Sequence, residues 1–158
     1  MPTASDSSNM TTQIPSLPNA DAPTVKAPVV RVLIVESDIT TADVLVEALE
    51  GAGYGVEVAT EASYGLLLAE SYAPHLFLIG SDAQRLNALD LTQSLRNAPH
   101  FGARFRDTPI IYIGNANGLI QQRFHALPGT PMSAYIFKPI DERELLEIVA
   151  RALSLAEH

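Results

Sequence analysis

The stretch Val32-Leu33-Ile34-Val35 is apolar throughout and is followed directly by the polar residues Glu36-Ser37-Asp38. Four apolar residues without alternation predict a short strand that is buried on both faces. Three later segments have the same form, a short apolar run that ends at small or polar residues: 76–82, 110–115 and 135–139. Strands of this kind are typical of a parallel sheet that helices cover on both sides.

Amphipathic helical patterns separate these runs. We expect helices over 41–50, 62–69, 86–95 and 119–127, a short second strand at 56–58 and a loop over 97–107. A last helix is expected to begin near Asp141, because Asp141 and Glu144 have the spacing of a capping box. Strand–helix units with right-handed crossovers give a doubly wound α/β fold, in which the site lies at the carboxyl ends of the strands.

Length and composition fit one folded domain. The chain has 158 residues, of which 47% are hydrophobic, and this is enough for one sizeable core. Residues 1–28 are rich in Ser, Thr, Asn and Pro and predict a flexible tail, so the folded domain is expected over 29–158. We see neither a signal peptide nor an apolar run that approaches the ~20 residues of a membrane span, and we expect a cytoplasmic protein.

Several functional classes are disfavoured. The net charge of −8 opposes generic binding to nucleic acid and to anionic membranes. The lack of cysteine excludes disulfides and thiolate chemistry, and the four histidines show no metal-ligand spacing. No serine lies in a nucleophile elbow, so we do not expect an enzyme. The acidic balance has one local exception, a basic cluster whose first interpretation is a solvated loop: Arg104, Arg106, Arg123, His100 and His125.

The expected strand ends collect polar and small residues at 36–38, 80–82, 114–115 and 138. With these residues and this order of strands and helices, the chain resembles the response-regulator receiver (CheY-like) family over about residues 30–155. The resemblance implies a five-stranded parallel sheet of order 2-1-3-4-5. It also implies a site in which an aspartate after the third strand is phosphorylated, while two acids after the first strand hold Mg²⁺. A Ser or Thr after the fourth strand and a Lys after the fifth bind the phosphoryl oxygens.

Most of these site positions have changed in this chain. The position of the acid pair corresponds to Glu36 and Ser37, so one acid is lost. The position of the acceptor corresponds to Gly80, and that of the hydroxyl to Gly114. The lysine is retained as Lys138. A glycine offers no carboxylate to phosphorylate, and one acid is a poor Mg²⁺ site. The switch aromatic falls on Tyr135. We therefore predict a pseudo-receiver, without Mg²⁺ or another cofactor, that acts as a phosphorylation-independent docking module.

Two alternatives remain open. Asp82 lies two residues after Gly80 and is a possible phosphoryl acceptor with Mg²⁺ if a bulge brings it back to the site. A small anion- or nucleotide-binding flavodoxin-like domain is the other alternative, because residues 115–118 open a helix after a strand. The glycine-rich stretch at 51–55 does not support it, since a phosphate loop must follow a strand and open a helix.

A closer resemblance concerns the pathway. Residues 36–38 and 113–118, with Gln122, look similar to the pseudo-receiver domain of a myxobacterial gliding-motility protein, and the likeness covers residues 108–141. It implies a role in cell polarity or motility. The departure from that protein is the lack of a long coiled coil after residue 155.

Receivers commonly bind their protein partners through the face made by the fourth helix, the fifth strand and the last helix. In this chain we expect that face at 119–127, at 135–137 and at the start of the last helix. The candidate interface residues are Gln121, Gln122, His125, Tyr135, Phe137, Glu142 and Arg143. Exposed aromatic residues there are suitable anchors, although Tyr135 and Phe137 also fit half-buried packing at the sheet edge. We expect a monomer or a weak homodimer, with no nucleic-acid partner and no membrane insertion.

Overall fold

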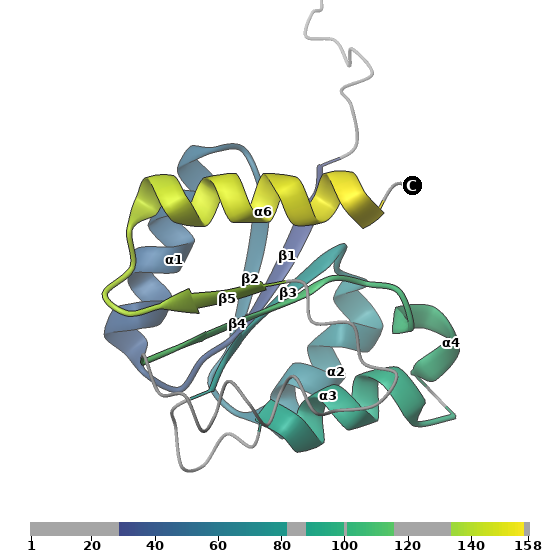
Figure 1. Ribbon diagram of the computed structural model, residues 1–158. Helices are drawn as coiled ribbons and strands as arrows, with labels where there is room; N and C mark the ends of the chain where they lie inside the picture. Colours follow the sequence, from purple (N-terminus) through teal and green to yellow (C-terminus); the bar gives the residue numbers. More distant parts are fainter. Residues whose placement is uncertain (1–28, 82–87, 100, 116–133, 157–158) are drawn as a thin grey trace, which may run out of the picture.

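A computed structural model describes residues 29–81, 88–99, 101–115 and 134–156. The described strands form one sheet in the order β2-β1-β3-β4-β5, and every neighbouring pair is parallel (Figure 1). The strands are β1 (Arg31–Val35), β2 (Gly55–Ala59), β3 (Leu76–Gly80), β4 (Ile110–Gly114) and β5 (Ala134–Phe137). The predicted doubly wound sheet of order 2-1-3-4-5 is confirmed.

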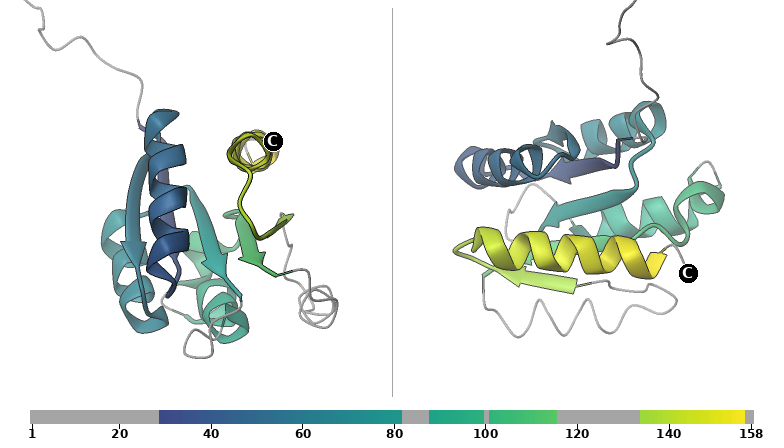
Figure 2. Two further views of the ribbon diagram at one scale, coloured as in Figure 1. Left: turned by 90° about the vertical axis from the view of Figure 1, so that its left-hand side faces the viewer. Right: turned by 90° about the horizontal axis from the view of Figure 1, so that it is seen from above.

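Helices cover both faces of this sheet. They are α1 (Ile39–Gly51), α2 (Ala62–Tyr72), α3 (Ala88–Asn97), the short α4 (Gly102–Phe105) and α6 (Glu142–Ala156). Figure 2 shows α1 and α6 on one side of the sheet and α2 and α3 on the other. None of the described helices has the length and hydrophobicity that crossing a bilayer would require.

Two cores explain why β1 shows no alternation in sequence. Val32 and Ile34 pack with α1 and α6 on one side of the sheet. Leu33 and Val35 pack with α2 and α3 on the other. All four side chains are at most 1% exposed. A central parallel strand that faces apolar helices on both sides must be apolar at every position.

Three expectations about the helices have different outcomes. Residues 97–107 were expected to be a loop, and this is wrong: they contain α4, because Phe105 is buried there with its ring edge-on to Phe77 at 5.3 Å. The cap of α6 is confirmed, since Oδ1 of Asp141 accepts hydrogen bonds from the backbone N–H of Arg143 and Glu144. The helix expected at 119–127 lies outside the described residues.

Candidate functional site

The carboxyl ends of the strands bring four of the predicted site residues to one edge of the sheet. Glu36 and Lys138 directly follow β1 and β5, while Gly80 and Gly114 are the last residues of β3 and β4. The parallel register aligns Val35 with Ile79, and Gly114 with Phe137. Residues that are far apart in the sequence therefore meet where the sequence pattern predicted a site.

Glu36 is the central residue of this edge. Its side chain is buried, with 2% exposed. Its Oε2 accepts a hydrogen bond of 3.0 Å from the backbone N–H of Asp38, and its own backbone N–H donates to the carbonyl of Ala59 at 2.9 Å. These bonds hold the carboxylate at the sheet edge with its charge facing the neighbouring strand ends.

The Glu36 carboxylate occupies the space beside Gly80. A Cβ atom at position 80 would lie 2.7 Å from Cδ and 2.9 Å from Oε2 of Glu36, closer than side-chain atoms approach one another. The missing side chain of Gly80 therefore leaves the volume that Glu36 fills. The two residues form a matched pair.

Lys138 faces the same carboxylate from β5. Its Nζ lies 4.0 Å from Oε1 of Glu36, and its side chain is 21% exposed. The backbone N–H of Lys138 donates to the carbonyl of Gly114 at 2.8 Å, which continues the pairing of β5 with β4. The Lys138–Pro139 peptide is cis. The retained lysine thus pairs with an internal carboxylate.

The acids of this edge do not fit an Mg²⁺ ion. Glu36 is engaged with Lys138 and with the N–H of Asp38. Asp38 is exposed, and its Oδ2 accepts a hydrogen bond of 2.6 Å from the Thr41 hydroxyl, which lowers the pKa of Asp38. Ser37 supplies a hydroxyl where a second carboxylate would be needed. No group of three potential metal ligands is present among the described residues.

Tyr135 is held by Ser81, a residue that the sequence placed at a strand end but to which it gave no role. Its hydroxyl lies 2.8 Å from Oγ of Ser81 and 3.4 Å from the carbonyl oxygen of Asn115. Ser81 is itself fixed, since its N–H and its hydroxyl both bond to the carbonyl of Ile113, at 2.7 and 3.1 Å. The ring packs against the core on the side of α2 and α3. The only signal for Ser81 in the sequence was its place directly after Gly80.

Part of the candidate interface lies within the described structure. Phe137 is 39% exposed and its ring centre lies 5.1 Å from that of Tyr135, which is half-buried. Glu142 and Arg143 are exposed in the first turn of α6. The remaining predicted site residues lie outside the described residues: Asp82, Gln121, Gln122 and His125.

Comparison with known proteins gives the family. A model of the response regulator receiver domain matches residues 32–150. The DNA-binding dual master transcriptional regulator RpaA of Synechocystis sp. is 30% identical over 123 residues, which are 78% of this chain and 48% of that protein. The chain thus spans about half the length of this curated relative.

Solved structures agree with that match. A CheY-like receiver domain protein of Methanospirillum hungatei JF-1 is 27% identical, with a TM-score of 0.69, over 82% of this chain and 98% of that chain. The chemotaxis response regulator CheY4 of Vibrio cholerae is 19% identical, with a TM-score of 0.68, over 79% of this chain and 99% of that chain, and it shows the fold alone. The chain therefore belongs to the response regulator receiver domain family of two-component signalling.

Proposed function

We propose that this receiver domain signals without accepting a phosphoryl group and serves as a docking module for a protein partner. The observation that carries the proposal is the buried Glu36 carboxylate, which fills the space beside Gly80 and pairs with Lys138. Position 80 is where the family carries the aspartate that is phosphorylated. In this chain that position has no carboxylate, and a side chain there would meet the Glu36 carboxylate where it now lies.

The charge arrangement supports the same conclusion. In the family, the lysine after the fifth strand meets the phosphoryl group. Here Nζ of Lys138 meets Oε1 of Glu36 at 4.0 Å. Both side chains are largely shielded from water, so salt screens their attraction less than that of a surface pair. The pair therefore favours one fixed state of this edge over a state that depends on a bound anion.

The switch residue supports a fixed state as well. The contacts of Tyr135 with Ser81 and with the carbonyl of Asn115 are made without any hydroxyl at Gly114. Phe137, next to it, offers an exposed aromatic side chain that suits a protein partner. The likeness of residues 36–38 and 113–118 to a gliding-motility pseudo-receiver leads us to place that partner in a motility or polarity pathway.

An amide NMR titration with Mg²⁺ and beryllofluoride tests this function. We expect no saturable shifts at residues 36–38, 80–81, 114 and 138, because the site offers neither an acceptor carboxylate nor a metal site. A receiver with an intact acid pair and acceptor serves as the positive control. Saturable shifts that spread from the strand ends would contradict the proposal, and a loss of those shifts in Asp82→Asn would identify Asp82 as the acceptor.

Replacement of Phe137 tests the docking face. We expect Phe137→Ser to weaken binding of the signalling partner at least about tenfold, because buried aromatic anchors commonly contribute 2 kcal/mol or more to an interface. Binding is measured by surface plasmon resonance with the partner that the wild-type chain captures by cross-linking. Leu155→Ser is the matched control, since Leu155 is a more exposed apolar side chain (69%) near the far end of α6. Equal affinities of the wild type and Phe137→Ser would place the interface on another face.

A further inference from the structure

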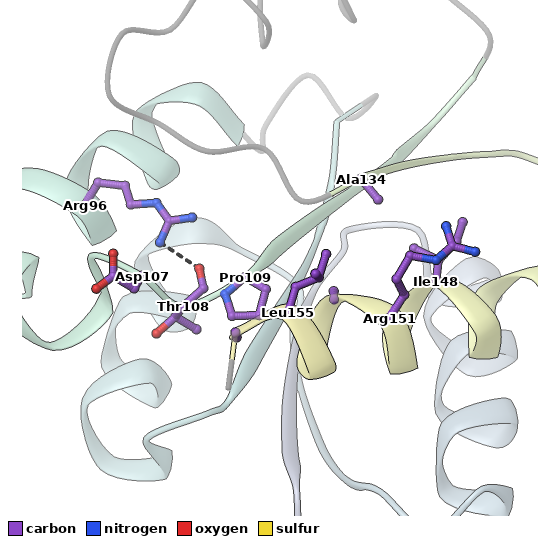
Figure 3. A pocket seen from close by; sticks show the side chains of 10 residues that line it. Arg96, Asp107, Thr108, Pro109, Ala134, Ile148, Arg151 and Leu155 are labelled. Atoms are coloured by element: carbon purple, nitrogen blue, oxygen red, sulfur yellow. Dashed lines mark hydrogen bonds between the residues drawn. The ribbon is translucent and has the colours of Figure 1, made fainter. Parts of the chain in front are cut away.

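A polar hollow lies at the amino-terminal ends of the strands, at the edge opposite Glu36 and Lys138. Its volume is about 440 Å³, and its charged or titratable lining residues are Arg31, His75, Arg104 and Asp107. A neighbouring hollow of about 270 Å³, drawn in Figure 3, shares Asp107, Thr108 and Pro109 with it and adds Arg96 and Arg151. We propose that the larger hollow binds a phosphate group, either free or carried by a small molecule.

The charge of this edge is unusual for the chain. Four of the ten Lys and Arg residues line the two hollows, in a protein whose net charge is −8. Among the described residues that line them, Asp107 is the one carboxylate. Positive charge is therefore concentrated at a place that the overall composition does not predict.

The arginines of the larger hollow are oriented by neutral groups. Nε of Arg31 donates to the carbonyls of Tyr72 and Ala73 at 2.9 and 3.1 Å, and its Nη2 donates to Ala73 at 2.8 Å. Nη2 of Arg104 donates to the carbonyl of Glu70 at 3.2 Å. A backbone carbonyl fixes a guanidinium without cancelling its charge, so both groups are positioned in advance for an anion.

His75 adds a third donor. Its Nδ1 accepts a hydrogen bond of 2.9 Å from the backbone N–H of Arg31, so the proton of the neutral ring is on Nε2. Burial and the nearby Arg31 lower the pKa of His75, which favours this neutral form at pH 7. The hollow therefore combines two guanidinium groups with an imidazole N–H donor.

Size and donor chemistry identify the ligand class. A volume of about 440 Å³ is that of a site for a small molecule. Guanidinium groups present paired N–H donors that match the oxygens of a phosphate group. A polyanion such as a nucleic acid would require an extended basic surface, which a chain of net charge −8 does not favour.

The test follows the imidazole resonances of His75 by NMR in the full chain. Inorganic phosphate and adenosine monophosphate are titrated separately, with sodium chloride at the same ionic strength as the control. We expect saturable shifts and a rise in the pKa of His75, because a bound anion stabilises the imidazolium and offsets Arg31. Comparison of the affinities for inorganic phosphate and adenosine monophosphate shows whether the hollow prefers the free ion or a phosphate ester. Shifts that sodium chloride reproduces would overturn the proposal.

Two arginines two residues apart provide a matched pair of variants. Arg104→Gln is expected to weaken phosphate binding about tenfold, the effect of losing one charge-assisted contact of roughly 1.4 kcal/mol. Arg106→Gln removes the same charge from an exposed residue that does not line the hollow, and should change the affinity less than about twofold. Asp107→Asn should strengthen binding, because it removes the opposing carboxylate. Equal losses in both arginine variants would show a net-charge effect and would overturn the site.

Discussion

Replacement of Gly80 by aspartate is expected to lower the free energy of unfolding by about 3 kcal/mol or more. The substitution introduces a side chain whose Cβ would lie 2.7 Å from Cδ of Glu36. The new side chain must displace a carboxylate that is 2% exposed and that is bonded to the Asp38 N–H. It also places a second negative charge beside Glu36, with Lys138 as the nearby cation.

Chemical denaturation of three variants separates the steric clash from the effect of the second negative charge. Gly80→Ala adds the Cβ atom without a charge and should cost about 1–3 kcal/mol. Gly80→Asp should cost more than Gly80→Ala. Glu36→Asp combined with Gly80→Asp should recover most of the lost stability, since the shorter side chain withdraws from position 80. If Gly80→Asp were as stable as the wild type, Glu36 would move aside at little cost and the matched pair would have no energetic basis.

The short apolar runs predicted the fold because a strand that is buried on both faces is apolar at every position. Val32 to Val35 are all buried, and a run of this kind has few interpretations other than a central parallel strand. The convergence of Glu36, Gly80 and Lys138 followed from the same topology, since the carboxyl ends of parallel strands share one edge. Both inferences use features that are local in sequence or fixed by the order of the elements.

The contacts within the edge could not be predicted in that way. A glycine at position 80 indicates only that a side chain is absent, and no local pattern tells which distant residue fills the space. The same is true of Ser81, whose hydroxyl meets Tyr135 only because β3 and β5 flank β4. Phe105 and α4 were missed because a four-residue helix has no periodicity to detect. Such features depend on side-chain packing across the fold.

Replacement of Arg96 by methionine is expected to lower the free energy of unfolding by about 3 kcal/mol. Arg96 is 5% exposed, and its Nη1 donates to the carbonyls of Phe105, Arg106 and Thr108. Burial lowers the pKa of its guanidinium. Methionine fills a similar volume but leaves the carbonyls between α4 and β4 without this donor. Arg151→Met is the control, with an expected change within about 0.5 kcal/mol, because Arg151 is an exposed residue of α6.

The same substitution has a second expected effect at the amino-terminal edge. Arg96 helps to hold the segment that carries Arg104, so its loss should loosen the position of Arg104 in the larger hollow. Arg96→Met should therefore weaken phosphate binding several-fold under conditions in which the protein is still folded, although Arg96 does not line that hollow. Isothermal titration with inorganic phosphate, well below the unfolding midpoint, measures this. Lower stability with unchanged phosphate affinity would show that Arg104 keeps its position without Arg96, and that other contacts, such as Phe105 with Phe77 and Arg104 with Glu70, hold the segment.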